Sequence, residues 1–290
     1  MVIVFNPSAG RRRVQLLWRV LDILIANGCR IEIAETVRRG HAEMLARDAA
    51  AKGARLVVAA GGDGTIAEVA NGLTGSAAKL GIIPLGTANV LAHELALPFV
   101  PQAVAAALAF GRTRPLWPGL ARRSERARLF VQMLSVGFDA AVVHRVSIAL
   151  KRMLGWGAYV YQTLRELPRY RFDPIRLVVD GEKTQAAGVI ISKGALYGGP
   201  FLLAPRAEPA EQGFSVVLFD WKGPAAALMY GAALPLNLLA RAPGIRRLRA
   251  ARIDFANDQP FLAQSDGDTV PWMPSSVADA PEPINIVVAP

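Results

Sequence analysis

The residues with the clearest chemistry form the run Gly61-Gly62-Asp63-Gly64-Thr65, which follows an apolar segment and precedes a helical pattern. Glycine permits positive φ angles and lets a phosphate approach the backbone without a Cβ in the way. A helix that begins here offers unpaired N–H groups and the positive end of its dipole. Thr65 can cap that helix or donate to a phosphate, and Asp63 can face Mg²⁺ or accept a substrate proton. The run predicts a phosphate loop, although an ordinary βα turn explains Gly-Gly-Asp-Gly alone equally well.

Two other strand-to-helix junctions carry similar residues. The expected strand over 80–83 leads into Pro84-Leu85-Gly86-Thr87-Ala88-Asn89, and the strand over 2–5 leads into Asn6-Pro7-Ser8-Ala9-Gly10. Loops that follow neighbouring parallel strands meet at the carboxyl edge of the sheet, where open α/β sheets bind ligands. We therefore expect the three loops to converge on one nucleotide site. Neither a Walker A pattern nor G-x-G-x-x-G is present, which argues against P-loop and Rossmann proteins.

The elements that must position these loops alternate between short apolar runs and helical patterns. We expect strands over 2–5, 30–34, 56–60 and 80–83, and helices over 14–24, 41–52, 65–73, 88–97 and 102–110. This alternation predicts a parallel sheet covered by helices. After Pro118 the pattern changes to strands, expected over 129–135, 175–179, 188–192, 214–219, 251–255 and 284–288, with helices over 141–167 and around 225–239. We therefore predict an α/β domain over 1–115 and a β-rich domain over 116–290, whose last strand can return to the first domain.

In combination, these motifs resemble the diacylglycerol kinase catalytic-domain family, which includes bacterial lipid kinases and sphingosine kinases. The first half matches through Asn6-Pro7-x-x-Gly10, Gly61-Gly62-Asp63-Gly64-Thr65 with Glu68-Val69-x-Asn71-Gly72-Leu73, and Pro84-x-Gly86-Thr87-Ala88-Asn89. The second half matches through Val136-Gly137-Phe138-Asp139-Ala140, Tyr197-Gly198-Gly199, Ala204-Pro205-x-Ala207 and Ser265-Asp266-Gly267-Asp268. The resemblance spans nearly the whole chain.

The resemblance implies an NAD-kinase/phosphofructokinase-like α/β domain, a C-terminal β-sandwich, and ATP in the cleft between them. It implies Mg²⁺-dependent transfer of the γ-phosphoryl group to a lipid hydroxyl. Asp268 is then the catalytic base, and Asp63 takes part in catalysis and faces the magnesium of ATP; in sphingosine-kinase-like members these two roles can be exchanged. Asp139 either binds the lipid head group or only ends a strand. The residues expected to hold ATP are Asn6, Thr36, Gly61, Gly62, Asp63, Gly64, Thr65, Glu68, Gly86 and Thr87.

Two positions depart from the family's pattern. Bacterial members carry glutamate where this chain has Asp268. A base must come within about 2.6–3.2 Å of the group that it deprotonates, so the shorter side chain requires a closer loop or a bridging water. The family also often has an aspartate before the glycine that corresponds to Gly213, where it binds a structural magnesium. Here Glu211-Gln212 precede that glycine, so we do not expect this second metal to be bound as in relatives.

The charge balance points to anionic partners. The formal net charge is +10, which suits an anionic membrane leaflet or phosphorylated substrates, and the sequence lacks the zinc-ligand, RNP and basic heptad patterns of nucleic-acid-binding proteins. Arginines and aromatic residues mix between His144 and Phe172, and basic residues recur at 246, 247, 249 and 252. Each cluster predicts either a membrane-facing surface or a solvated basic face.

Three weaker features of the sequence bear on the cellular location of the protein. The chain has a single cysteine, Cys29, and its start reads as a strand without a signal-peptide pattern. The apolar stretch over 224–240 is interrupted by Pro235 and Asn237 and is shorter than the ~20 residues that span a bilayer. We expect a cytoplasmic protein, peripheral to the inner face of the membrane.

Two other functions stay open at this point. Gly-Gly-Asp-Gly-Thr also occurs in NAD kinases, so an NAD-kinase-like phosphotransferase is one alternative, which the Pro-x-Gly-Thr-Ala-Asn loop and the Tyr-Gly-Gly segment oppose. The departures at Asp268 and Gln212 motivate the other, a catalytically weak protein that binds lipid or nucleotide.

Overall fold

Unit 1 of the computed structural model is formed by Met1–Trp117 together with Pro281–Pro290, and unit 2 is formed by Pro118–Ala280. The structure describes residues 1–9, 13–147, 150, 153–155, 157–257 and 259–289. Gly10, the last residue of the first predicted loop, lies outside the described residues, as do Lys151, Arg152 and Trp156 of the basic and aromatic segment.

A mainly parallel sheet forms the centre of unit 1. Strands β2, β1, β3, β4 and β20 run parallel to their neighbours, and β5 is antiparallel to β20 at one edge. The apolar runs of β1, β3 and β4 are buried on both faces, as in other parallel sheets, whereas the edge strand β2 is mostly exposed. In spatial order the strands are β2 Glu32–Glu35, β1 Val2–Phe5, β3 Leu56–Gly61, β4 Lys79–Pro84, β20 Ile284–Val288 and β5 Arg112–Leu116.

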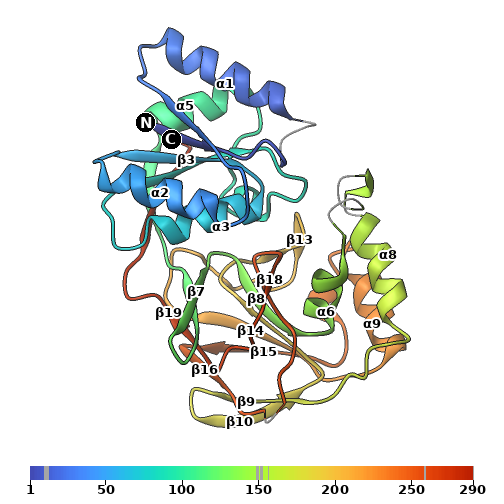
Figure 1. Cartoon of the computed structure of the whole chain (residues 1–290). Coiled ribbons are helices and arrows are strands. Elements are labelled where there is room, and N and C mark those ends of the chain that lie inside the picture. Colours follow the sequence, from blue (N-terminus) through green and yellow to red (C-terminus); the bar gives the residue numbers. More distant parts are fainter. Residues whose placement is uncertain (10–12, 148–149, 151–152, 156, 258, 290) are drawn as a thin grey trace. The chain divides into compact units, whose positions relative to one another are not determined.

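Helices cover both faces of this sheet. Figure 1 shows α1 (Val14–Ala26) and α5 (Pro101–Phe110) on one face, and α2 (His41–Ala51) and α3 (Asp63–Gly72) on the other. The short helix α4 spans Val90–Glu94. The buried stripe of α1 consists of Leu17, Val20, Leu21 and Leu24, which pack with strand residues such as Ile3, Phe5 and Val58. The 3.6-residue periodicity of the sequence therefore predicted both the helix and its packed face.

Two antiparallel sheets form unit 2. One has the strand order β10-β9-β16-β19-β6-β7 and the other the order β15-β14-β11-β8-β17-β18. Their inward-facing residues, among them Phe130, Leu134, Ile191, Phe214 and Ile253, form one apolar core, as in a β-sandwich. The strands are β6 Gly119–Arg123, β7 Arg126–Phe130, β8 Met133–Gly137, β9 Ile175–Val179, β10 Glu182–Ala186, β11 Gly188–Ser192, β14 Phe214–Phe219, β15 Ile245–Ala250, β16 Arg252–Phe255, β17 Ala263–Ser265, β18 Asp268–Val270 and β19 Ser276–Asp279.

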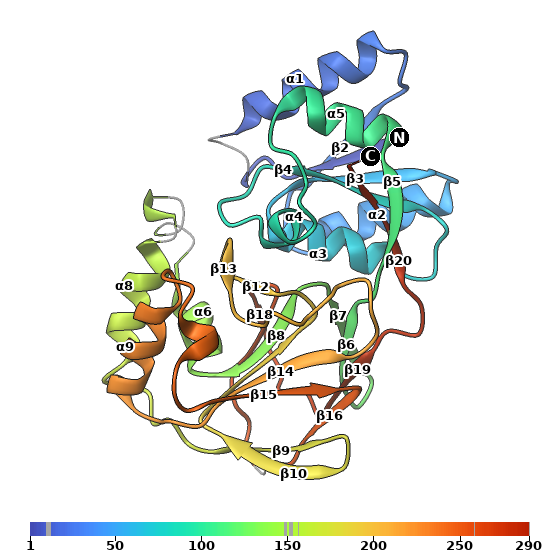
Figure 2. The same ribbon diagram turned by 180° about the vertical axis from the view of Figure 1, so that it is seen from behind.

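Helices and a small ribbon complete unit 2 (Figure 2). Helix α9 packs on the second sheet through Ala226 and Tyr230, which cluster with Met133, Ile190 and Val217. Helices α6 and α8 contact each other around Val142 and Ala158. The elements are α6 Phe138–Arg145, α8 Gly157–Glu166, α9 Pro224–Ala233, the 3₁₀ turn Leu239–Arg241 and the ribbon of β12 Leu196–Tyr197 and β13 Phe201–Leu202. In the described part of the chain, every helix is too short or too polar to cross a membrane.

Some sequence-based boundaries were wrong. The single strand expected over 129–135 is two strands, β7 and β8, because a turn at Val131–Gln132 separates them. The helix expected over 141–167 is replaced by α6 and α8, which are separated by a segment that is only partly described. The helix expected up to 239 ends at Ala233, just before Pro235, since proline cannot continue a regular helix.

Candidate functional site

Two glycine loops of unit 1 pack backbone against backbone. The N–H groups of Leu85 and Gly86 donate to the carbonyl of Gly61 at 2.9 and 3.2 Å. A Cβ on Gly86 would lie 2.5 Å from the Cα of Gly62, so no side chain fits between the loops. The loops follow the neighbouring parallel strands β3 and β4 and therefore meet at one edge of the sheet. This glycine-lined edge has the open backbone that a phosphate requires.

The loop after β1 joins this edge through Asn6. Its Nδ2 donates to Oγ1 of Thr65 at 3.0 Å, and its Oδ1 accepts the N–H of Ser8 at 2.9 Å. Thr65 is buried, and its side chain lies over Gly61, where a Cβ would be 2.5 Å from Oγ1. The expectation that Thr65 caps α3 was wrong, because α3 begins at Asp63 and has Gly62 as its N-cap. Asn6 and Thr65 therefore connect the first loop to the second.

Asp63 lies in the first turn of α3 and faces the start of α4. Its Oδ1 accepts the N–H of Leu91 at a long 3.4 Å, and the residue is only partly buried. Burial raises the pKa of this carboxyl, while the backbone N–H groups of Leu91 and Val90 oppose the rise. A partly exposed carboxylate beside a glycine loop can meet a metal ion or a proton.

Asn89 closes the loop after β4 and was not among the predicted site residues. It is fully buried with a positive φ of 47°, and its Nδ2 donates to the carbonyl of Gly86 at 2.9 Å. Asparagine tolerates this left-handed conformation better than most residues, which is the signal that the sequence offered. Thr87, which was predicted to hold ATP, is exposed on the same loop.

Glu68 and Thr36 support the loop that precedes α2. The carboxylate of Glu68 accepts the N–H groups of Gly40 and Ala42 at 2.8 and 3.1 Å. Gly40 is the N-cap of α2, so Glu68 provides the side-chain acceptor that this helix start otherwise lacks. Thr36 is buried just after β2, and its N–H donates to the carbonyl of Phe5 at 2.8 Å. The structure thus gives Glu68 a positioning contact that its place in the motif did not reveal.

In unit 2, Asp266 and Gly267 form the two-residue turn between β17 and β18. Their φ angles are 50° and 81°, as a type I′ hairpin requires. The buried carboxylate of Asp266 accepts the N–H groups of Val131, Gln132 and Met133 at 2.8, 2.9 and 2.9 Å. Burial raises the pKa of Asp266 to about 6, although these N–H donors and Arg128 lower it.

Asp268, the predicted base, is the first residue of β18 and pairs in register with Ser265. Its carboxylate is 3.9 Å from a guanidinium nitrogen of Arg128, and 20% of its side chain is exposed. The turn locked by Asp266 therefore presents the carboxylate of Asp268 at the start of a strand, where solvent reaches it.

Asp139 belongs to a polar cluster built from separate elements of unit 2. Ser135 of β8 and Tyr197 of β12 donate their hydroxyls to its carboxylate, and Nε2 of Gln264 on β17 donates at 3.0 Å. Ser135 and Gln264 are buried. Burial, followed by the nearby charge of Asp139, raises the pKa of Tyr197 well above its usual range, so its hydroxyl stays a donor. Asp139 lies in the first turn of α6, two residues after the end of β8, and its carboxylate connects the members of this cluster.

Comparison with known proteins agrees with this arrangement. Residues 1–119 match the family model described as the diacylglycerol kinase catalytic domain. Residues 132–288 match the model described as the YegS C-terminal NAD kinase beta sandwich-like domain. A protein of Xanthomonas axonopodis pv. citri (strain 306) named "Probable lipid kinase YegS-like" is 30% identical over 263 residues, which cover 87% of this chain and 84% of that protein.

The chain belongs to the diacylglycerol kinase catalytic-domain family. The diacylglycerol kinase of Bacillus subtilis (strain 168) is 33% identical over 187 residues, and this match covers 63% of the chain and 60% of that protein. A crystal structure described as a diacylglycerol kinase from Bacillus anthracis str. Sterne superimposes with a TM-score of 0.73 at 18% identity, covering 100% of this chain and 96% of that one. At this identity the superposition supports the fold alone. An N-terminal α/β domain and a C-terminal β-sandwich are both present, as predicted.

Family motifs thus fall at two places in this chain. The structure brings together Asn6, the Gly61–Thr65 loop and Gly86 within unit 1. Within unit 2, Asp139 and the Asp266–Asp268 turn lie on adjoining elements, because α6 contacts both β17 and β18. Sequence reasoning did not single out Tyr197 and Gln264 as partners of Asp139, since they are 58 and 125 residues away in the chain. Ser135 is only four residues from Asp139 and was also not singled out.

Proposed function

We propose that this protein is a lipid kinase that transfers the γ-phosphoryl group of ATP to the hydroxyl of a diacylglycerol-like or sphingoid lipid. The observation that carries the proposal is the backbone contact between Gly62 and Gly86, which brings two glycine loops together at the ends of the neighbouring strands β3 and β4. The names of the relatives, lipid kinase and diacylglycerol kinase, support a lipid as the acceptor.

The loops and carboxylates of the two units have proposed tasks in this reaction. The backbone N–H groups of the Gly61–Thr65 loop bind the phosphates, Gly86 keeps the second loop against the first, and the hydroxyl of Thr87 adds a donor. Mg²⁺ bound with ATP neutralises the charge of the transferred group, and the half-buried carboxylate of Asp63 faces that ion. As the lipid hydroxyl attacks the γ-phosphorus and the bond to the ADP oxygen breaks, Asp268 takes the hydroxyl proton. Asp139, held by Ser135, Tyr197 and Gln264, contacts the polar head of the lipid.

A transfer assay tests the proposal. The protein is incubated with γ-labelled ATP and Mg²⁺ and, separately, with diacylglycerol, sphingosine, ceramide, phosphatidylglycerol or NAD⁺. We expect label in one or more of the lipids and none in NAD⁺. Gly86→Ala places a Cβ against the backbone of Gly62 and should abolish both nucleotide binding and transfer. The matched control, Gly231→Ala, adds a Cβ in open space and should transfer normally.

The other outcomes of this assay are equally informative. Label in NAD⁺ alone would replace the proposal with an NAD-kinase-like activity. Calorimetric binding of ATP without transfer to any acceptor would identify a protein that binds nucleotide and has lost catalysis.

For the membrane, the structure favours one of the two basic clusters over the other. On α8, the apolar side chains of Val160, Tyr161 and Leu164 are exposed, and Arg165 lies 5.7 Å from the ring of Tyr161. Exposed apolar residues beside a cation suit an interfacial helix, so we place the peripheral contact with anionic lipid here. By contrast, the arginines expected to form a second basic surface are paired within unit 2: Arg246 with Asp220, Arg249 with Glu211 and Arg252 with Asp254.

Vesicle sedimentation distinguishes these surfaces. The double variant Tyr161→Ser, Leu164→Ser should lower binding to vesicles that contain phosphatidylglycerol, whereas Arg252→Ser should leave it unchanged. Equal loss in both variants would contradict the placement on α8.

A further inference from the structure

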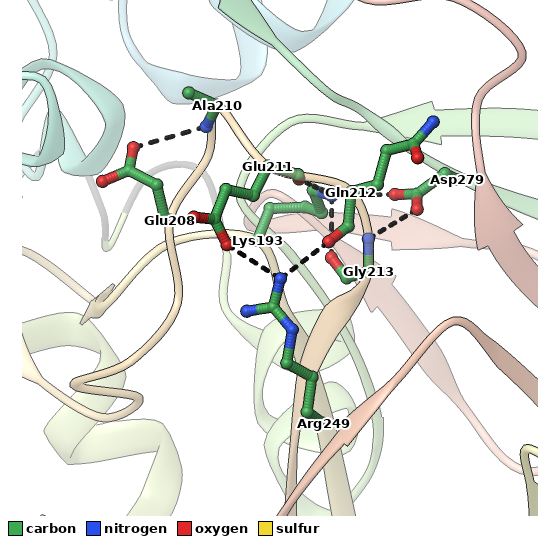
Figure 3. A network of polar contacts seen from close by, with 8 residues as sticks. All are labelled: Lys193, Glu208, Ala210, Glu211, Gln212, Gly213, Arg249 and Asp279. Atoms are coloured by element: carbon green, nitrogen blue, oxygen red, sulfur yellow. Dashed lines mark hydrogen bonds and ion pairs between the residues drawn. The ribbon is translucent and has the colours of Figure 1, made fainter.

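Lys193 is a buried cation surrounded by oxygen atoms. It directly follows β11, and its side chain has no exposed surface. Its Nζ donates to the carbonyl of Glu211 at 2.9 Å, to the carbonyl of Gly213 at 2.8 Å and to Oδ1 of Asp279 at 2.8 Å. Figure 3 shows the three oxygens directed at this one nitrogen.

The segment that surrounds Lys193 directs successive carbonyls at cations. Between the carbonyls of Glu211 and Gly213, that of Gln212 accepts from the Arg249 guanidinium at 2.9 Å. Asp279 connects the lysine to the same segment, because its Oδ2 accepts the N–H of Gly213 at 2.5 Å. The backbone before β14 is therefore folded around positive charge, and each of these contacts lies within unit 2.

The geometry requires the charged form of Lys193. A neutral amine has two N–H donors and a lone pair that would face an oxygen, whereas an ammonium has three donors for the three acceptors. The ring of Phe214, with its centre 4.8 Å from Nζ, also favours a cation. Burial lowers the pKa of Lys193, and the hydrogen bond and charge of Asp279 oppose that change.

Such a set of oxygens is also the kind that binds a hard divalent ion. Ca²⁺ and Mg²⁺ take carbonyl and carboxylate oxygens as ligands. The resemblance implies a structural magnesium in relatives beside the glycine that corresponds to Gly213. In this chain, Nζ of Lys193 lies among the oxygens beside Gly213. The residue before Gly213 is Gln212, which offers no carboxylate. Over the described residues, no group of three or more His, Cys, Asp or Glu side chains could hold a metal. The residues present do not fit the magnesium.

We infer that the ammonium of Lys193 replaces the structural metal ion of this sandwich, so that unit 2 folds around a cation that is part of its own chain. A covalently attached ammonium cannot dissociate or be removed by a chelator. The stability of this unit should therefore be independent of divalent ions. If the protein is the proposed kinase, its need for Mg²⁺ is confined to the nucleotide. The inference itself does not rest on the proposed function, because it is tested without ATP.

The first test uses the wild-type protein. Its metal content is measured by elemental analysis, and its thermal unfolding is followed in EDTA and in millimolar Mg²⁺ or Ca²⁺, without nucleotide. We expect no stoichiometric divalent metal and a Tm that differs by less than about 1 °C between the conditions. About one equivalent of tightly held Mg²⁺ or Ca²⁺, with a Tm that falls on chelation, would overturn the inference.

The second test removes the ammonium. Lys193→Ala leaves the carboxylate of Asp279 and two carbonyls without their cation, and should lower the Tm by about 8 °C or more in EDTA. Because the vacated oxygens form a cation shell, Mg²⁺, Ca²⁺ or methylammonium should restore part of this loss. Asp279→Asn in the Lys193→Ala background should abolish the rescue by divalent ions.

The matched control is Lys183→Ala, which removes an exposed lysine from β10 of the same unit. Its Tm should change by less than about 1 °C and should not respond to added cations. A folded Lys193→Ala protein that is insensitive to every cation would contradict the assignment of these oxygens as a cation shell. If Lys193→Ala does not fold, the wild-type measurements still decide between ammonium and metal.

Discussion

Asp63-Gly64 in unit 1 and Asp266-Gly267 in unit 2 are the same dipeptide in opposite situations. Asp63 begins a helix, is partly exposed, and accepts one long hydrogen bond of 3.4 Å from Leu91. Asp266 forms a hairpin turn, is buried, and accepts three N–H groups at 2.8–2.9 Å. Burial raises the pKa of both carboxyls. The comparison indicates that Asp266 holds the fold, whereas Asp63 is less firmly held. In the proposed reaction the base is Asp268, two residues after Asp266.

The largest effect expected from this comparison is on stability. Asp266→Ala leaves three buried N–H groups without an acceptor and places alanine at a positive φ, so the free energy of unfolding should fall by about 3–5 kcal/mol. Asp180 is a matched control, because it also begins an Asp-Gly turn at positive φ and accepts the N–H groups of Ala251 and Arg252, but it is exposed. Asp180→Ala should cost about 1 kcal/mol. Equal losses of unfolding free energy in Asp266→Ala and Asp180→Ala, measured by urea denaturation, would contradict the distinction between the buried and the exposed turn.

A pH dependence of stability is the next effect. The pKa of Asp266 is about 6 in the folded protein, against about 3.9 for an unfolded aspartate. Between these values the folded protein binds more protons, so its stability should decrease as the pH rises from about 4 to about 6, by up to about 3 kcal/mol. Asp266→Asn cannot take up this proton. The stability of the wild type minus that of Asp266→Asn should therefore fall over this range, and a difference that stays constant would contradict the raised pKa.

Replacement of Asp63 should have the smallest effect on stability, but it should lower the phosphoryl-transfer activity. Asp63→Asn should lower phosphoryl transfer about 10- to 100-fold, or about 1.4–2.7 kcal/mol, because the amide no longer attracts Mg²⁺. Its unfolding free energy should change by less than about 1 kcal/mol, since the hydrogen bond that Asp63 accepts from Leu91 is long. Asp48→Asn, on the exposed face of α2, should change neither quantity. A large loss of stability in Asp63→Asn would show that Asp63, like Asp266, holds the fold, and would contradict the comparison.

The contrast also shows what the sequence could and could not predict. The loops of unit 1 were predicted because their signals are local: a strand, glycines and a helix start follow one another in the chain. In unit 2, the turn at Val131–Gln132 was missed because the carboxylate that holds it lies 134 residues away from Gln132. For the same reason, sequence patterns could not show that Glu68 supports the start of α2, or that Lys193 meets Asp279, 86 residues further along.

Among the sequence signals, clusters of charged residues were the least reliable for predicting surfaces. Arg246 and Arg249, which suggested a basic surface, are paired with carboxylates of Asp220 and Glu211 from other segments, which no local pattern reveals; Arg252 pairs with Asp254 on its own strand. By contrast, the helical spacing of the apolar residues over 14–24 correctly predicted the buried face of α1, formed by Leu17, Val20, Leu21 and Leu24. Periodicity reports burial directly, whereas the partner of a charge depends on tertiary structure.

The central claim is that Asp268 removes the proton from a lipid hydroxyl as the γ-phosphoryl group is transferred. The most direct measurement is single-turnover transfer from labelled ATP to the lipid accepted by the wild type, compared for Asp268→Asn and for Asp254→Asn, an exposed aspartate of β16. Asp268→Asn should bind ATP normally and transfer at least about 100-fold more slowly, whereas Asp254→Asn should match the wild type. Full transfer by Asp268→Asn would contradict the account.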